Sequence, residues 1–423
     1  MTDRLSPAVR RLVSCTVVSS FGTGLTLPFT LILLHEVRGI PLSTTGLLLA
    51  VMGVVGLLVV PVSGALIDRV GPRFVLRSAS LLLAAGNLGL AFATSALTAL
   101  PALVLIGAGL APSFPAIGAL MSGLVDGAVA KQRAFGIQFT ALNASIGVGG
   151  IAAASIVDVH RPITFQVLFV GNALTCLVST LLVPRARTQP PVDHHGEPAP
   201  PSYREVLADG TFRRVLAVAL LLAVTGYAAL DSGLPAYARV VGQVSPRVIA
   251  LVFAVNTAVI VIGQLAVLRL LRGHRRSTAL ALCLLMWGVS WSVLLVVPGL
   301  SDTGKVVVVL AFGGLFGLGE TLMAPTLSPL VNDLATDRLR GRYNALQGAT
   351  FSIAFVVSPA VSAGLIGAGL GRAWLLAIVA GCLFGAVVAA RLRRRLTPAQ
   401  DGLVSGPGPA GDALQSAVLS GAG

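Results

Sequence analysis

Residues 64–76 read GALIDRVGPRFVL, a short charged turn between two long apolar segments. An acid at the C-terminal end of a helix opposes the helix dipole, so Asp68 requires a cation or the N-terminus of another helix as its partner. Gly71 suits a helix C-terminus, and Pro72 suits the first turn of the helix that follows. The stretch therefore predicts two helices joined by a short turn that carries charge.

The composition of the chain indicates that these helices lie in a lipid bilayer. Of the 423 residues, 55% are hydrophobic and 11% are charged, and the mean hydropathy is +0.89. Soluble globular domains carry about 25% charged residues. The net charge of +14 does not indicate a nucleic-acid partner, because the arginines lie in short clusters between apolar runs and not on one soluble face.

The cysteines and histidines give no sign of a metal site or a disulfide framework. All four cysteines fall inside apolar runs and none forms a C-x-x-C pair, so we expect no metal and no cofactor. The apolar run from Leu12 to Leu34 follows Arg10 and Arg11, as in a signal peptide. It is too long for one and has no cleavage context, so we expect a retained first helix.

Twelve segments have the length and hydropathy of membrane-spanning helices, which need about 20 mostly apolar residues. A stretch rich in proline and charge separates the sixth segment from the seventh. We therefore predict an N-terminal six-helix bundle (1–184), a cytoplasmic linker (185–212), a C-terminal six-helix bundle (213–395) and a disordered tail (396–423). The predicted spans are 11–34, 43–67, 73–95, 98–124, 133–157, 162–184, 213–238, 246–271, 276–299, 304–331, 341–368 and 371–391.

The distribution of positive charge predicts the orientation of these helices. Lys and Arg are enriched in cytoplasmic loops of membrane proteins. With the N-terminus inside, only six of the 30 Lys and Arg residues fall on the outer side, so both termini are predicted to be cytoplasmic and the chain to be a multi-pass protein of the cytoplasmic (inner) cell membrane. The six are Arg38, Arg161, Arg239, Arg247, Lys305 and Arg372.

The charged turn resembles the signature G-x-L-x-D-R-x-G-x-R between helices 2 and 3 of the major facilitator superfamily. Residues 332–346 also resemble the loop between helices 10 and 11 of its bacterial drug-efflux members. The resemblance covers roughly residues 10–395 and implies an all-α fold of two six-helix bundles around a substrate cavity. It also implies a conformational latch, whose partner for the acid is the N-terminus of helix 11. The latch residues are Gly64, Asp68, Arg69, Gly71, Arg73 and Arg340.

Two positions depart from signatures of proton-coupled family members. Leu103 occupies the place of an arginine in the helix 4 signature, and Ile146 the place of a proline in the helix 5 antiporter signature. Both departures concern how transport is coupled and leave the implied fold unchanged.

Glu320 is the only acid near the middle of a predicted span, and a charge at that depth costs about 2.5–3.5 kcal/mol. It is a candidate proton-coupling residue, the alternative being a structural carboxyl bonded to a neighbouring helix. Asp231 and Tyr227 share a face of the seventh helix and are candidate cavity residues, as are Thr23 and Thr26 on the first.

Other polar residues in or near the spans are predicted to be structural. Glu36 and His35, at the outer end of the first helix, are expected at the surface. Asn143 and Gln347 are expected to make hydrogen bonds between helices.

These features predict a secondary active transporter, a monomer that exports a small amphipathic molecule by alternating access in exchange for protons. A facilitator-type uptake permease or uniporter is the first alternative, favoured by Leu103 and Ile146. A receptor or scaffold that has lost transport is another. A membrane enzyme is not supported, because no loop gathers an acid, a base and a nucleophile.

Overall fold

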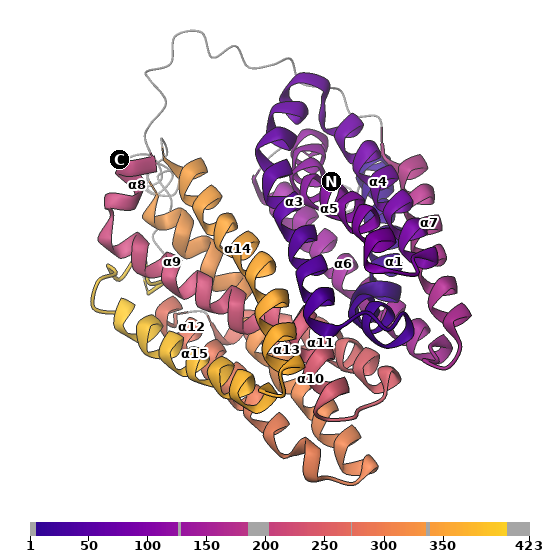
Figure 1. Cartoon of the computed structure of the whole chain (residues 1–423). Helices are drawn as coiled ribbons and strands as arrows, with labels where there is room; N and C mark the ends of the chain where they lie inside the picture. Colours follow the sequence, from indigo (N-terminus) through magenta and orange to yellow (C-terminus); the bar gives the residue numbers. More distant parts are fainter. Residues whose placement is uncertain (1–5, 126–127, 185–202, 272, 336–338, 404–423) are drawn as a thin grey trace, which may run out of the picture.

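The computed structural model describes residues 6–125, 128–184, 203–271, 273–335 and 339–403 (Figure 1). These ranges are all helical and contain no strand, and twelve of their helical segments are long and apolar enough to cross a membrane. The predicted fold class is confirmed, and the spans agree with the predicted ones to within several residues at most ends.

The first six spans form one bundle, here called the N bundle. Its first span runs through α1 (Pro7–Thr26), η1 (Leu27–Phe29), α2 (Thr30–Ile32) and the π-helical η2 (Leu33–Val37). The other five spans are α3 (Leu42–Val70), α4 (Pro72–Phe92), α5 (Ala96–Leu124), α6 (Ala128–Ile156) and α7 (Pro162–Leu182).

The last six spans form a second bundle, the C bundle, preceded by the short helix α8 (Tyr203–Ala208). Its first span runs through α9 (Gly210–Leu222), the π-helical η3 (Ala223–Gly233) and α10 (Leu234–Val240). The others are α11 (Pro246–Leu270), α12 (Arg276–Val293) with η4 (Leu294–Gly299), α13 (Asp302–Leu334), α14 (Arg340–Gly367) and α15 (Gly371–Leu392).

The turn between α3 and α4 has the geometry that its sequence predicts. Gly71 takes φ +86°, a backbone conformation that favours glycine, and its N–H donates to the carbonyl of Ile67 at 3.0 Å to end α3. Pro72 then occupies the first position of α4, where a missing N–H costs nothing.

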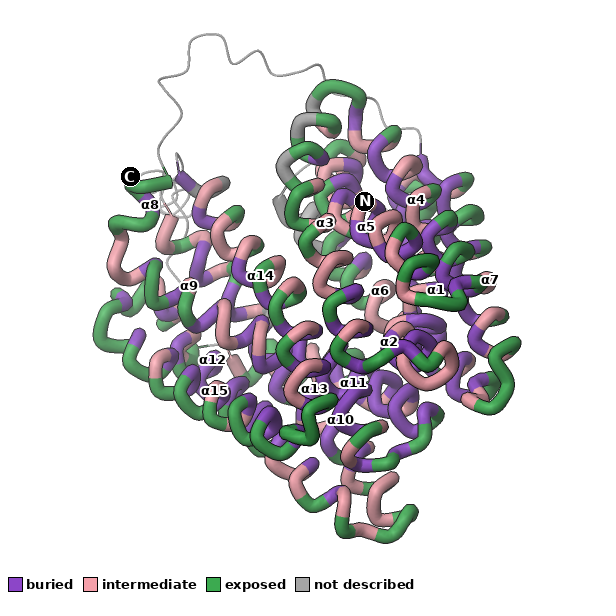
Figure 2. Tube along the Cα trace, in the orientation of Figure 1, coloured by how far each residue is buried: buried purple, intermediate pink, exposed green. Residues whose placement is uncertain are grey.

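Exposed residues alternate with buried ones along the helices of both bundles (Figure 2), and many of the exposed residues are large and apolar. Leu58, Leu181 and Ile262 are 68%, 71% and 80% exposed, as expected of surfaces that face lipid. The buried interior of the C bundle instead packs aromatic rings, with Trp287 and Phe316 stacked at 4.6 Å between ring centres. Both bundles therefore lack the pattern of soluble proteins, in which an apolar interior is covered by a polar surface.

The two bundles meet along two helix pairs, α3 with α14 and α6 with α11. Small residues allow close approach in the half of the seam away from the chain termini. A Cβ on Gly46 would lie 2.6 Å from the Pro359 carbonyl oxygen, and one on Gly53 would lie 2.9 Å from the Phe355 carbonyl oxygen. Both distances are shorter than real Cβ contacts, so glycine is required at these two positions.

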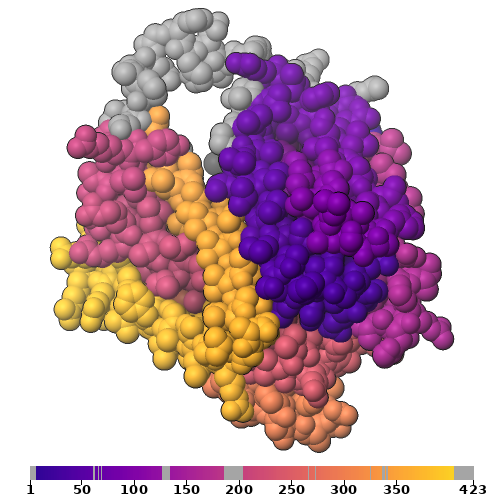
Figure 3. All heavy atoms as spheres, in the orientation of Figure 1, coloured from indigo at the N-terminus to yellow at the C-terminus, as the bar shows by residue number. Residues whose placement is uncertain are grey.

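The bundles separate toward the other end of the seam, here called the terminal end, where α1 begins and α15 finishes (Figures 1 and 3). A Cβ on Gly64 of α3, or on Gly348 of α14, would meet no atom within 4 Å. The structure is thus a conformer that is closed at the end opposite the termini.

Two predicted segments are described only in part. Most of the predicted linker (185–202) and most of the predicted tail (404–423) lie outside the described residues. The first residues of the predicted disordered tail are ordered against α12. Asp401 is fully buried there, accepts hydrogen bonds from the N–H and hydroxyl of Ser277 at 2.8 and 2.9 Å, and forms an ion pair with Arg275 at 3.1 Å.

Candidate functional site

Glu320 lies buried in α13, with 7% of its surface exposed, and its two carboxyl oxygens contact two other helices of the C bundle. The Tyr227 hydroxyl in η3 donates to Oε1 at 2.7 Å. The Asn256 side-chain amide in α11 donates to Oε2 at 3.2 Å. The carboxyl therefore ties together three spans, and both of its hydrogen-bond donors are neutral.

Aromatic side chains pack around Tyr227, the residue that donates to this carboxyl. Tyr227 packs edge-on against Trp287, with ring centres 6.0 Å apart, and lies 5.9 Å from Phe351 of α14. The Trp287 indole N–H donates to the Phe316 carbonyl at 2.9 Å, which fixes the ring beside α13. The ring leaves room only for glycine at Gly319, where a Cβ would lie 2.8 Å from the indole nitrogen.

The helix that carries Tyr227 and Asp231 is π-helical over eleven residues, Ala223–Gly233. The π-helix is rare, usually a single-turn bulge, and is frequent at functional sites. The Trp291 indole N–H donates to the Thr225 carbonyl at 2.7 Å and so provides a side-chain partner inside this segment. The sequence does not single out this conformation, because residues 223–233 contain no proline and their two glycines, Gly226 and Gly233, are equally compatible with an α-helix.

Asp231 lies in the same π segment, four residues after Tyr227, and is half-buried. Within the described residues no charged side chain acts on its carboxyl and no hydrogen bond reaches it. Asp231 is thus a carboxyl available for a partner that the chain itself does not provide, at a position where a lasting charge is costly.

The hydroxyls of Thr23 and Thr26 in α1 both have hydrogen-bond partners inside the N bundle. Thr23 donates to the Ser19 carbonyl at 3.1 Å, as hydroxyls in membrane helices commonly do. Thr26 is buried inside the N bundle, where it accepts a hydrogen bond from Asn172 of α7 at 2.8 Å. Asn172 also donates to Asn87 of α4 at 3.0 Å. Thr26 therefore belongs to a polar network within one bundle and does not face the other bundle.

The interhelical role predicted for one amide is wrong. Asn143 donates to the Phe139 carbonyl of its own helix at 2.9 Å. The amide network between helices is formed by Asn172 and Asn87 instead, and a further amide, Gln138 of α6, donates to the Thr16 hydroxyl of α1. In sequence all of these amides sit in similar apolar runs, so only the packing distinguishes them.

An ion pair that the sequence did not predict joins the two bundles at the closed end. Arg239 in α10 forms a two-point contact with Glu36 in η2, with one N–H···O distance of 2.5 Å. Arg239 also donates to the Val244 carbonyl at 2.7 Å. Nearby, Arg247 of α11 donates to the Val157 carbonyl of the N bundle at 3.1 Å. The surface position predicted for Glu36 is wrong, because its side chain is only 20% exposed.

The residues of the predicted latch lie at the separated, terminal end. The side chains of Asp68 and Arg340 lie outside the part of the chain that the structure describes, although their backbones belong to α3 and α14. Arg69 is exposed, and no neighbouring atom lies close to Gly64. Arg73 is half-buried in α4, and its Nε has no hydrogen-bond partner.

Known proteins resemble this chain mainly in fold. A family model described as Major Facilitator Superfamily matches residues 12–280 and 243–420. A peptide transporter POT solved in complex with sulfate is 16% identical and has a TM-score of 0.69; the match covers 94% of this chain and 96% of that chain. A D-xylose-proton symporter is 12% identical and has a TM-score of 0.70, with 93% and 98% covered. No curated protein matches the chain significantly in sequence.

Proposed function

Because the chain belongs to the Major Facilitator Superfamily and is therefore a multi-pass membrane transporter and not an enzyme, we propose that it exports a small amphipathic molecule in exchange for protons. The supporting observation is the buried Glu320 carboxyl held by Tyr227 and Asn256. Transport follows alternating access, in which the two bundles rock around a site between them.

Glu320 is the proton carrier in this proposal. Its hydrogen-bond partners, Tyr227 and Asn256, are neutral, so an ionised carboxylate there has no full countercharge among its contacts. A charge without a countercharge is unfavourable in a water-excluding interior and tolerable when water enters. Opening the transporter to one side therefore changes the proton affinity of the carboxyl, which couples proton movement to the rocking of the bundles.

Asp231 selects the substrate in this proposal. Its half-buried carboxyl has no cation beside it in the part of the chain that the structure describes, and it lies on the same π segment as Tyr227. A substrate with a positive charge supplies the missing partner, and its apolar part suits the partly exposed rings of Tyr227 and Phe351, whose centres lie 5.9 Å apart. The preferred substrates are therefore amphipathic cations.

The orientation in this proposal follows the distribution of cations, with the terminal end in the cytoplasm of a cell-membrane protein. The conformer described above is then open to the cytoplasm and closed to the outside, where Glu36 and Arg239 form the outer gate. The latch of Asp68, Arg69 and Arg73 against the N-terminus of α14 forms in the opposite conformer. The transporting unit is a monomer.

Inside-out vesicles loaded with a pH-sensitive dye and supplied with ethidium, an amphipathic cation, test the coupling. Wild type should accumulate ethidium under an imposed proton gradient and lose the accumulation when a protonophore is added. Glu320→Gln should fold normally but transport at the same rate with and without the gradient. Asp231→Asn should change the range of cations accepted more than the coupling, and Asp302→Asn removes an exposed acid as a matched control.

An unchanged response of Glu320→Gln to the gradient would assign Glu320 to structure alone. Facilitated uptake is the second candidate, favoured by Leu103 and Ile146 at positions where proton-coupled relatives carry arginine and proline. It predicts substrate equilibration without proton flux. Substrate binding without any flux would instead identify a receptor.

A further inference from the structure

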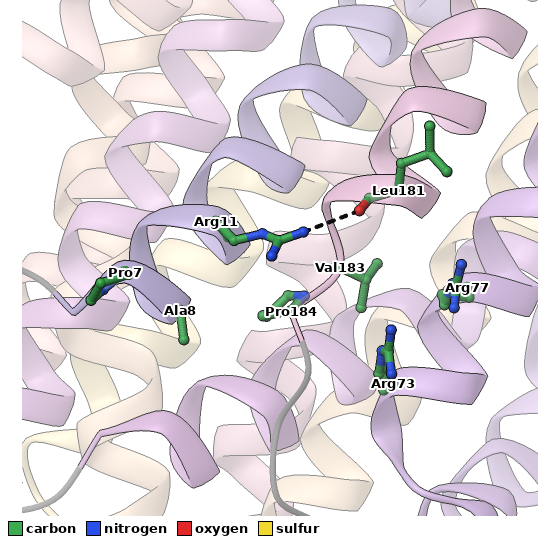
Figure 4. Close-up of a pocket in the computed structure, with 8 residues that line it drawn as sticks. All are labelled: Pro7, Ala8, Arg11, Arg73, Arg77, Leu181, Val183 and Pro184. Carbon is green, nitrogen blue, oxygen red and sulfur yellow. Dashed lines mark hydrogen bonds between the residues drawn. The ribbon is translucent and has the colours of Figure 1, made fainter.

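A cavity of about 560 Å³ opens at the terminal end of the N bundle (Figure 4). Arg11 of α1 and Arg73 and Arg77 of α4 line it, and the remaining lining residues are apolar. Its walls are α1, α4 and the end of α7, whereas the seam with the C bundle is made by α3 and α6. The cavity is therefore separate from the proposed transport pathway.

Positive charge accumulates in this cavity without an acid among its lining residues. Among the described residues, Arg11 donates only to the Leu181 carbonyl, at 3.4 Å, and Arg73 Nε is buried without a partner. Arg73 also stands in the first turn of α4, where the helix dipole disfavours a cation.

Apolar side chains continue from the cavity along the bilayer-facing surface. Leu81 follows Arg77 by one helical turn and is 49% exposed. On α7, Leu181 and Leu177 are 71% and 43% exposed, one turn apart. The apolar part of a ligand whose anionic group contacts the arginines could therefore pack against exposed leucines of both α4 and α7.

We propose that this cavity binds the phosphate of an anionic glycerophospholipid, whose acyl chains lie along the exposed leucines of α4 and α7. Guanidinium groups bind phosphate oxygens in two-point contacts, and basic pockets between membrane helices on the cytoplasmic side suit lipid head groups. The adjacent apolar surface favours a lipid over a free phosphate ion, because the phosphate ion has no apolar group that could pack against it. This site goes beyond the transport function proposed above, although it shares Arg73 with the proposed latch.

Native mass spectrometry of the full chain in detergent measures the binding directly. The ligands are phosphatidylglycerol and phosphatidylcholine with the same acyl chains. The double variant Arg11→Gln/Arg77→Gln should weaken phosphatidylglycerol binding about 25-fold, at about 5-fold per arginine, and leave phosphatidylcholine unchanged. Arg11→Lys/Arg77→Lys keeps both charges and should retain most of the affinity.

The control variant Arg393→Gln/Arg394→Gln removes two exposed arginines near the end of α15 and changes the net charge equally. An equal loss of affinity in this control would overturn the proposal, because net charge alone would explain the binding. Unchanged affinity in the glutamine variant would also overturn it, as would loss in the lysine variant. Displacement of phosphatidylglycerol by equimolar inorganic phosphate would assign the cavity to a free anion instead.

Discussion

Breaking the ion pair between Glu36 and Arg239 should shift the protein toward a conformer that is open at the end where this structure is closed. Glu36→Gln keeps the shape of the side chain but removes its charge and one of its two acceptor oxygens, leaving the Arg239 guanidinium with neutral partners, one amide oxygen and the Val244 carbonyl. Exposed ion pairs contribute about 0–1 kcal/mol, and removing one partner of a buried pair costs about 3–5 kcal/mol. With 18% and 20% of the two side chains exposed, an intermediate loss of about 2 kcal/mol is expected.

A loss of about 2 kcal/mol corresponds to a shift of about 30-fold in the ratio of the two conformers. Spin labels at His160→Cys and Thr303→Cys report this ratio, because these two exposed positions lie in different bundles at the closed end, His160 in the turn before α7 and Thr303 in the first turn of α13. The four native cysteines are buried. Double electron–electron resonance measures the distance between the two labels. In Glu36→Gln it should show a population at longer distance that is minor in the labelled protein that retains Glu36.

Two further variants make the reasoning refutable. The swap Glu36→Arg/Arg239→Glu should restore the original distance distribution, because it rebuilds the pair in reverse. Lys305→Gln removes a cation at the same end, whose contact with Asp302 is 3.8 Å and stays within one bundle, and should change nothing. A Glu36→Gln distribution identical to that of wild type, or a swap that fails to restore it, would show that the pair does not hold the bundles together.

Three other outcomes are expected. Asp68→Asn should express normally and transport at less than about a tenth of the wild-type rate; full activity would limit the turn to a topological role. Asp401→Ala removes the carboxylate that accepts hydrogen bonds from the N–H and hydroxyl of Ser277 and pairs with Arg275, so it should destabilise the protein by about 1–2 kcal/mol. Thermal unfolding measures this loss, and Asp302→Ala at an exposed position is the control that should show no change. A reporter fused after Arg395 should be cytoplasmic and one inserted near Ser301 external; an external C-terminal reporter would contradict the proposed orientation.

Hydropathy and turn chemistry were sufficient to predict the fold. Each span has to satisfy its backbone hydrogen bonds internally, so its length and location follow from local sequence. Gly71 and Pro72 likewise act through their own backbone geometry, and both were predicted correctly.

The partners of the polar side chains could not be predicted in the same way. Glu320 was recognisable as a buried acid, and Tyr227 as a residue on the seventh span, but their contact depends on how two helices rotate against each other. The pairing of Glu36 with Arg239 joins residues 203 positions apart across the two bundles. Neither residue carries a local signal of that distant contact, so the sequence pattern alone favoured a surface position.

The π-helical segment Ala223–Gly233 has a mechanical consequence for these two distant sites. Tyr227, which holds the buried carboxyl, lies within the segment, and Arg239, which closes the gate, lies beyond it. If the segment gave up one residue of register and became an ordinary α-helix, everything beyond it would turn by about 100° and advance by about 1.5 Å. Tyr227 and Arg239 could not then both keep their partners, Glu320 and Glu36. A change in the winding of this segment would therefore couple the contact at the buried carboxyl to the ion pair between the bundles.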